Sequence, residues 1–106
     1  MSDVADRVLA ALNAHDLEAF VACYAEDATI EDGYDRVASR GHDELRARFG
    51  STFADYPELR IELISRTVVG EFVVQEENVT GRGDHHRHVA VYLIEDGLIK
   101  RERLFA

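Results

Sequence analysis

Hydrophobic positions recur at helical spacing near the start of the chain. The residues Val4, Val8, Ala11 and Leu12 predict a helix over about 2–13. Asp16 is a good N-cap and predicts the start of a second helix, so that 13–16 forms the turn between the two. The apolar stripe of this second helix comprises Leu17, Phe20, Val21 and Tyr24.

A short strand, a polar loop and a third helix are predicted next. The strand covers 28–32 and the loop runs from Gly33 to Gly41. The third helix covers about 43–54, with Leu45, Phe49 and Phe53 spaced four residues apart, and it ends at the Tyr56-Pro57 break.

The second half of the chain changes to the patterning of strands. Four strands are predicted over about 59–69, 71–80, 86–95 and 98–105. The pair Asp96-Gly97 lies between the last two and favours a type I′ hairpin, in which both central residues need a positive φ. Helices followed by a meander of strands indicate an α+β fold with a curved antiparallel sheet.

The strand at 86–95 is apolar on both faces, because every residue from Val89 to Ile94 is hydrophobic. Such a strand lies at the centre of a sheet whose two faces are both covered. One face would pack on the helices. We expect a second copy of the chain to cover the other, which predicts a homodimer through the outer face of the sheet.

The neighbouring strands contain polar runs that alternation cannot keep on one face. Residues 75–78 are polar at four consecutive positions and residues 100–103 are charged at four. If Ile99 faces the helices, Arg101 and Arg103 do too, whereas if Leu104 does, Glu102 joins it. Two interpretations stay open: ion pairs in a dimer interface or on a solvated rim, or a polar-tipped pocket.

Composition and charge limit the class of protein. With 106 residues, 46% of them hydrophobic and 31% charged, the chain is predicted to form one domain over 1–106. Its net charge of −9 makes nucleic acid and anionic membranes improbable partners. The N-terminal residues lack the pattern of a signal peptide and Cys23 is the single cysteine, so we expect a cytoplasmic location.

The run His85-His86-Arg87-His88 does not predict a metal site. Strand alternation places His86 and His88 on one face and His85 on the other, and no cysteine or carboxylate stands at zinc-ligand spacing. Two ligands are too few, so no metal is expected. His88 shares its face with Ala90 and Tyr92 and could reach a cavity as a proton donor or base.

Three segments carry a family resemblance. They are Leu12-Asn13-Ala14-His15-Asp16-Leu17, Cys23-Tyr24-Ala25-Glu26-Asp27-Ala28-Thr29-Ile30-Glu31-Asp32 and the closing Asp96-Gly97-Leu98-Ile99-Lys100-Arg101-Glu102-Arg103-Leu104-Phe105. With these segments the chain resembles the ketosteroid isomerases and the SnoaL-like members of the nuclear transport factor two-like superfamily. The resemblance implies a cone-shaped, cystatin-like α+β barrel, in which the curved sheet wraps the N-terminal helices and leaves a cavity.

The resemblance also bears on catalysis. Asp32 matches the aspartate that acts as general base in the isomerases, and alternation turns one of Glu31 and Asp32 inward. The isomerases' two oxyanion-hole donors are matched by Val8 and Ala90, which cannot donate hydrogen bonds, and this argues against steroid isomerase activity.

These arguments predict a small-molecule pocket protein that binds a compact apolar ligand with one or two polar groups and needs no cofactor. If it is an enzyme, it acts by proton transfer as an isomerase, cyclase or dehydratase. The alternative is a non-catalytic dimeric interaction module with a filled core, and a cavity of roughly 300 Å³ would favour the pocket. The candidate catalytic residues are Asp32, His88, Tyr92 and Arg103. The candidate ligand-binding residues are Phe20, Tyr24, Phe49, Phe53, Glu77, Arg101 and Phe105.

Overall fold

The computed structural model describes residues 3–33, 36–83 and 85–106, which form three helices and six strands. In chain order these are α1 (Asp3–Ala14), α2 (Leu17–Val21), β1 (Tyr24–Asp32), β2 (Arg36–Arg40), α3 (Gly41–Asp55), β3 (Arg60–Val69), β4 (Phe72–Thr80), β5 (His86–Glu95) and β6 (Leu98–Phe105). None of these helices is long and apolar enough to cross a membrane.

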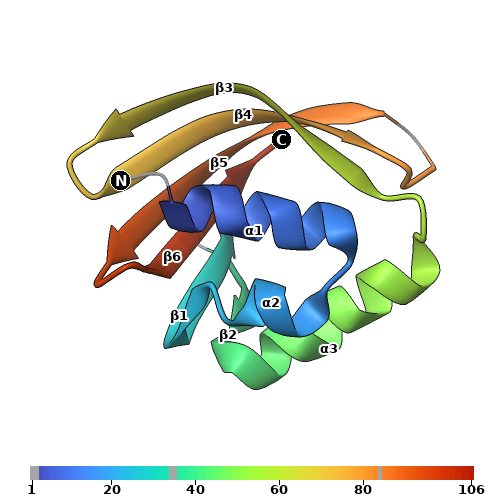
Figure 1. Ribbon diagram of the computed structural model, residues 1–106, viewed down its shortest axis with the longest axis horizontal. Coiled ribbons are helices and arrows are strands. Elements are labelled where there is room, and N and C mark those ends of the chain that lie inside the picture. The colour runs from blue at the N-terminus through green and yellow to red at the C-terminus, as the bar shows by residue number, and fades with distance from the viewer. Residues whose placement is uncertain (1–2, 34–35, 84) are drawn as a thin grey trace.

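The strands form one curved sheet with the order β2-β1-β6-β5-β4-β3. Only the β1–β6 pair is parallel, and it joins the short N-terminal hairpin to the C-terminal meander. The three helices lie together on one side of the sheet (Figure 1), which we call the inner face. The opposite side is the outer face. This arrangement confirms the predicted α+β fold with a curved sheet wrapped around N-terminal helices.

The core forms where the helical stripes meet the inner face. In α1 the predicted stripe of Val4, Val8, Ala11 and Leu12 is buried. Asp16 caps α2 as predicted, since its side chain accepts from the backbone N–H of Ala19 at 3.1 Å.

Two parts of the prediction need correction. The second helix ends at Val21 instead of reaching Tyr24, because the chain becomes extended there and β1 begins four residues before the predicted 28. The predicted loop from Gly33 to Gly41 contains the strand β2. Of the residues in β2 only Ser39 is buried, as expected of a charged edge strand, so its sequence lacks the apolar alternation that identifies a strand.

Two of the three hairpins of the meander, β5–β6 and β4–β5, show why left-handed residues are needed. Asp96 and Gly97 have φ values of 54° and 76°, as the type I′ prediction requires. At the other hairpin Gly81 has φ 86°, and a Cβ atom there would lie 2.0 Å from the Glu58 carbonyl oxygen. Gly81 therefore allows the β4–β5 turn to approach the segment that follows α3.

We predict that Gly81→Ala destabilises the fold more than Gly83→Ala. Both glycines have a positive φ, but a Cβ at Gly83 meets nothing within 4 Å. Left-handed backbone costs an alanine roughly 1–2 kcal/mol at either position. The collision with Glu58 adds about 1–3 kcal/mol at Gly81 alone. Urea unfolding of both variants measures the difference, and equal losses would show that the close approach is not a constraint.

Candidate functional site

An internal cavity lies between the inner face of the sheet and helices α2 and α3. Its volume is about 90 Å³, room for about three water molecules at roughly 30 Å³ each. One part of the lining is apolar: Leu12, Phe20, Phe49, Leu59, Ile61, Val79 and Leu104. The other part is polar: Tyr24, Arg48, Thr52, Glu77, Arg82, His88, Tyr92 and Glu102.

A β-bulge decides which part of the charged run on β6 faces this cavity. Leu93 pairs with Arg101 and Ile94 pairs with Ile99, so Lys100 is an extra residue on β6. The bulge places both Ile99 and Glu102 in the interior, where strict alternation would allow only one of them. Lys100 reaches Asp27 at 2.6 Å.

Glu102 is the carboxyl group most altered by its surroundings. Its residue is only 6% exposed, and the Tyr24 hydroxyl donates a hydrogen bond to Oε1. Burial, with a smaller contribution from the negative charge of Glu77, raises the pKa of Glu102 to about 7, although the bond from Tyr24 acts in the opposite direction. Glu102 can therefore give up or accept a proton near neutral pH.

Two tyrosines beside Glu102 remain hydrogen-bond donors. Burial is the main cause that raises the pKa of Tyr24 and of Tyr92 well above the usual value, and the charge of Glu102 raises both further. Their phenol groups are therefore protonated throughout the neutral range. The cavity thus contains one carboxyl group that titrates near pH 7 and two neutral phenols.

A second buried glutamate is held by a chain of hydrogen bonds from β4 to the surface. Glu77, only 2% exposed, accepts from Gln75 Nε2 at 2.5 Å and lies 2.6 Å from His88 Nε2. Gln75 Oε1 in turn accepts from Arg66 Nε at 2.9 Å, and Arg66 Nη1 lies 2.6 Å from Asp6 Oδ1.

This chain of bonds fixes the direction of each donor. Arginine can only donate, so the Gln75 carbonyl must face Arg66 and its amide N–H must face Glu77. Both oxygens of Glu77 then act as acceptors, and Nε2 of His88 carries the hydrogen that is shared with Glu77.

The structure brings together six of the eleven residues predicted from the sequence. Those that line the cavity are Phe20, Tyr24, Phe49, Glu77, His88 and Tyr92. Phe53 is not among the lining residues and packs against Phe20 and Phe49, with its ring stacked on His15 at 4.9 Å. Phe105 lies beside Gly33 at the end of β6.

The two predicted arginines lie on the outer face. Arg101 and Arg103 bind the carboxylate of Glu31 at 2.7 and 2.6 Å. The hydrogen bond from Arg101, with that from Arg103, lowers the pKa of Glu31 to about 2 despite burial of the carboxyl group. The acid that is buried at the end of β1 is therefore Glu31, and it faces away from the cavity.

Asp32 shares the inner parity of Ile30, but its side chain is 54% exposed and pairs with Arg36. It borders a separate depression of about 190 Å³. The residues common to this depression and the cavity are Arg48, His88 and Leu104. Asp32 therefore lines the neighbouring depression and is not among the residues that line the cavity.

The patterns of the sequence did not identify every group at the site. Glu102 belonged to one of two alternative sets of β6 residues that alternation could turn inward, and only the bulge selects it. Arg48 and Arg82 are exposed residues that line the cavity from α3 and from the β4–β5 turn, and nothing in the local pattern distinguishes them from other surface arginines.

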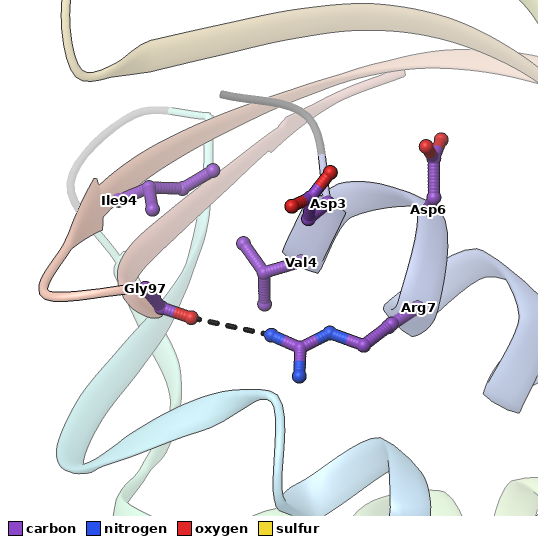
Figure 2. A pocket seen from close by; sticks show the side chains of 6 residues that line it. All are labelled: Asp3, Val4, Asp6, Arg7, Ile94 and Gly97. Carbon is purple, nitrogen blue, oxygen red and sulfur yellow. Dashed lines mark hydrogen bonds between the residues drawn. The ribbon is translucent and has the colours of Figure 1, made fainter.

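A larger, open depression of about 550 Å³ lies at the start of α1 beside the β5–β6 turn. Figure 2 shows Arg7 extended toward the carbonyl of Gly97, with Asp3 and Asp6 on the adjacent turn of the helix. None of the titratable residues that line this depression is buried. The inner cavity is therefore the better candidate for chemistry.

Comparison with known proteins agrees with this architecture. The family model of the SnoaL-like domain matches residues 5–102, so the chain belongs to the SnoaL-like domain family. A search of curated proteins found no match. An uncharacterised cystatin-fold protein from Novosphingobium aromaticivorans superposes with a TM-score of 0.90 at 26% identity, over 98% of this chain and 96% of that chain.

Two further crystal structures share the fold. One, from Sinorhizobium meliloti, is provisionally described as a polyketide cyclase and has a TM-score of 0.86 at 23% identity, covering 98% of this chain and 94% of that chain. The other, from Kribbella flavida, is provisionally described as a ketosteroid isomerase. It has a TM-score of 0.80 at 23% identity, covering 96% of this chain and 73% of that chain.

We predict that Glu102 makes the free energy of unfolding fall as pH rises from about 4.5 to 7. The folded chain keeps the proton of Glu102 up to about pH 7, whereas an ordinary glutamate loses it near 4.5. Protonated Glu102 therefore stabilises the fold fully below pH 4.5, and this contribution is lost as pH rises through 7. At about 1.4 kcal/mol per pKa unit, the change approaches roughly 3 kcal/mol.

Urea unfolding of Glu102→Gln and of the unchanged protein at several pH values measures this effect. The free energy of unfolding of Glu102→Gln should increase relative to that of the unchanged protein as pH rises to 7. Glu62→Gln, which alters an exposed glutamate on β3, is the matched control and should give a constant difference. A constant difference for Glu102→Gln as well would contradict the assignment.

Proposed function

We propose that the cavity binds a compact carbonyl compound and catalyses proton transfer on it without a cofactor, with Glu102 as the general acid–base. The observation that carries this proposal is a buried carboxyl group with a pKa near 7 that lines an internal cavity. Such a group balances the ionised fraction and the basicity needed at neutral pH. The SnoaL-like domain family and the two provisionally described enzymes with this fold support a ligand-binding, catalytic role.

Three polar groups of the cavity have a part in the proposed reaction: Glu102, Tyr92 and Tyr24. Ionised Glu102 removes a proton from the carbon next to the carbonyl. The C–H electron pair forms a C=C bond, the C=O π pair moves to the oxygen, and the resulting enolate accepts hydrogen bonds. Tyr92 lines the same cavity and supplies such a donor through its phenol group, whereas the Nε2–H of His88 is already shared with Glu77. Glu102 then returns its proton to the same or a neighbouring carbon. Tyr24 orients the Glu102 carboxylate through its hydroxyl.

This assignment differs from the one made from sequence. Asp32 is half-exposed and paired with Arg36, and Arg103 is bound to Glu31 on the outer face, so neither is placed to act inside the cavity. Of the residues predicted to be catalytic, Tyr92 keeps a direct role in the proposal, and His88 lines the cavity as the hydrogen-bond partner of Glu77. The apolar part of the lining, including Phe20 and Phe49, excludes water from the carbonyl.

The alternative function, an interaction module without catalysis, is favoured by one observation. The cavity of about 90 Å³ is smaller than the roughly 300 Å³ typical of ligand pockets. The proposal therefore requires a ligand whose reacting end has only a few non-hydrogen atoms.

We predict that Glu102→Gln abolishes catalysed exchange of the α-hydrogens of a small ketone. In D₂O, proton NMR of acetone or cyclopentanone reports deuterium incorporation directly. Loss of a general base lowers the rate by about 10²–10⁴-fold. For the unchanged protein, kcat/KM should rise with pH to a plateau above about 7, because the ionised carboxylate is the base.

Two further variants make the exchange measurement decisive. Glu62→Gln should exchange the ketone at the unchanged rate, since Glu62 is exposed on β3. If Asp32→Asn stops the exchange and Glu102→Gln does not, Asp32 is the base and the proposal for Glu102 is wrong. Absence of catalysed exchange in the unchanged protein would favour the interaction module.

We also propose that the chain acts as one unit over 1–106 and pairs with a second copy through the outer face of the sheet. There Phe72 is 48% exposed and forms an apolar depression with Val91 and Leu93, bordered by Arg101 and Arg103. Exposed apolar patches of this kind typically mark protein interfaces.

We predict that Phe72→Glu converts a dimer into a monomer, because a charge in this patch would be buried without a partner. Sedimentation equilibrium measures the mass of the assembly. Val37→Glu is the control, since Val37 is 42% exposed on β2, at the other edge of the sheet. Retention of the dimer in Phe72→Glu would exclude this face as the interface.

A further inference from the structure

Two arginines stand at the opening of the cavity, and they come from different elements. Arg48 lies on α3 and Arg82 lies in the turn between β4 and β5. This turn lies above the C-terminal end of α3, at the right of Figure 1. Both residues are exposed, whereas Glu77 and Glu102 of the same lining are buried. Their guanidinium groups therefore border the entrance, and the carboxyl groups lie inside it.

Aromatic rings hold both guanidinium groups. The Arg48 group lies 5.4 Å from the centre of the Phe49 ring, and the Arg82 group lies 5.2 Å from the centre of the Tyr56 ring. Cation–π contacts of this kind orient an arginine without neutralising its charge. Arg48 also donates a long hydrogen bond of 3.5 Å to the hydroxyl of Ser39, and its positive charge lowers the pKa of Glu102 against the larger effect of burial.

Neither arginine forms an ion pair with a carboxylate in residues 3–33, 36–83 and 85–106. The same holds for Arg7, Arg40 and Arg60 in those residues. An acid pairs with each of six other arginines: Arg36, Arg46, Arg66, Arg87, Arg101 and Arg103. What distinguishes Arg48 and Arg82 is that both line the same cavity. Arg48 and Arg82 together therefore create a local excess of positive charge at the opening of the cavity.

The groups inside the cavity do not cancel this charge fully. Glu77 is bonded to Gln75 and to His88, and Glu102 is bonded to Tyr24 and carries a proton for part of the time at neutral pH. An approaching anion therefore meets guanidinium groups first, in a protein whose overall charge would otherwise repel it.

We propose that the ligand of this cavity is a short oxo acid, whose carboxylate is bound by Arg48 and Arg82 while its carbonyl end enters the cavity. The guanidinium group matches the planar carboxylate in shape and charge. The cavity of about 90 Å³ leaves room for the acetyl end of such a molecule and no more. This inference names the substrate class for the proposed function and rests on it.

The test compares levulinate with its neutral amide, 4-oxopentanamide, which has the same carbon skeleton and the same ketone. Both are titrated into the full chain at constant ionic strength, and the backbone amide signals of cavity residues are followed by NMR. Hydrogen bonds to charged groups are strong enough that levulinate should bind at least about tenfold more tightly than the amide. Equal affinities, or no shift of cavity signals by levulinate, would overturn the inference.

Variants locate the source of any preference. Each of the variants Arg48→Gln and Arg82→Gln should weaken the binding of levulinate by about tenfold and leave the affinity for the amide unchanged. Arg60→Gln removes the same charge from an exposed position on β3 that does not line the cavity, and it should leave both affinities unchanged. An equal loss in Arg60→Gln would show a general charge effect and would overturn the assignment to the opening.

The outcome is separate from that of the exchange experiment. Ketone exchange that depends on Glu102, combined with equal binding of levulinate and the amide, overturns only the oxo-acid inference. A strong preference for levulinate, without any exchange that depends on Glu102, overturns only the catalytic proposal.

Discussion

The structure depends on how two glutamates are held in the interior of a small α+β domain. Burying an ionised carboxylate without partners costs several kcal/mol, so each group must be paired or protonated. Glu77 is paired, since it accepts from Gln75 and lies against His88. Glu102 has the Tyr24 hydroxyl and is protonated below about pH 7. Two carboxyl groups in one cavity thus have different environments, which is the usual way in which a fold separates an acid–base group from its supporting residues.

The bulge at Lys100 determines which residues form this interior. It allows Ile99 to fill the core and Glu102 to line the cavity, and it leaves Arg101 and Arg103 on the outer face with Glu31. One extra residue on β6 therefore separates the internal acid–base site from the ionic cluster on the opposite side. Without the bulge, strict alternation along 100–103 would turn either Arg101 and Arg103 or Lys100 and Glu102 toward the helices.

Sequence patterns predicted the elements whose periodicity is strong. The helix stripe of Val4 and Val8, the cap at Asp16 and the turn at Asp96-Gly97 are set by local spacing, and the structure has all three. The edge strand β2 was missed because exposed edge positions need no apolar alternation.

The chemistry of the site was less predictable than the fold. Whether Glu102 or Arg101 faces inward depends on the bulge, and the burial of Glu31 depends on its parallel pairing with Arg103, more than seventy residues away in the chain. The periodicity of a single strand predicts neither the bulge nor the pairing between distant strands. Arg48 is an exposed helix residue by its local pattern, and only the position of α3 against the sheet brings it to the cavity opening.

The titration of the Glu102 carboxyl carbon by ¹³C NMR, assigned by its absence from the spectrum of Glu102→Gln, tests the central claim most directly. The account predicts a midpoint at about pH 7. A midpoint near pH 4.3, the ordinary value for an exposed glutamate, would show that Glu102 is solvated and would contradict the account.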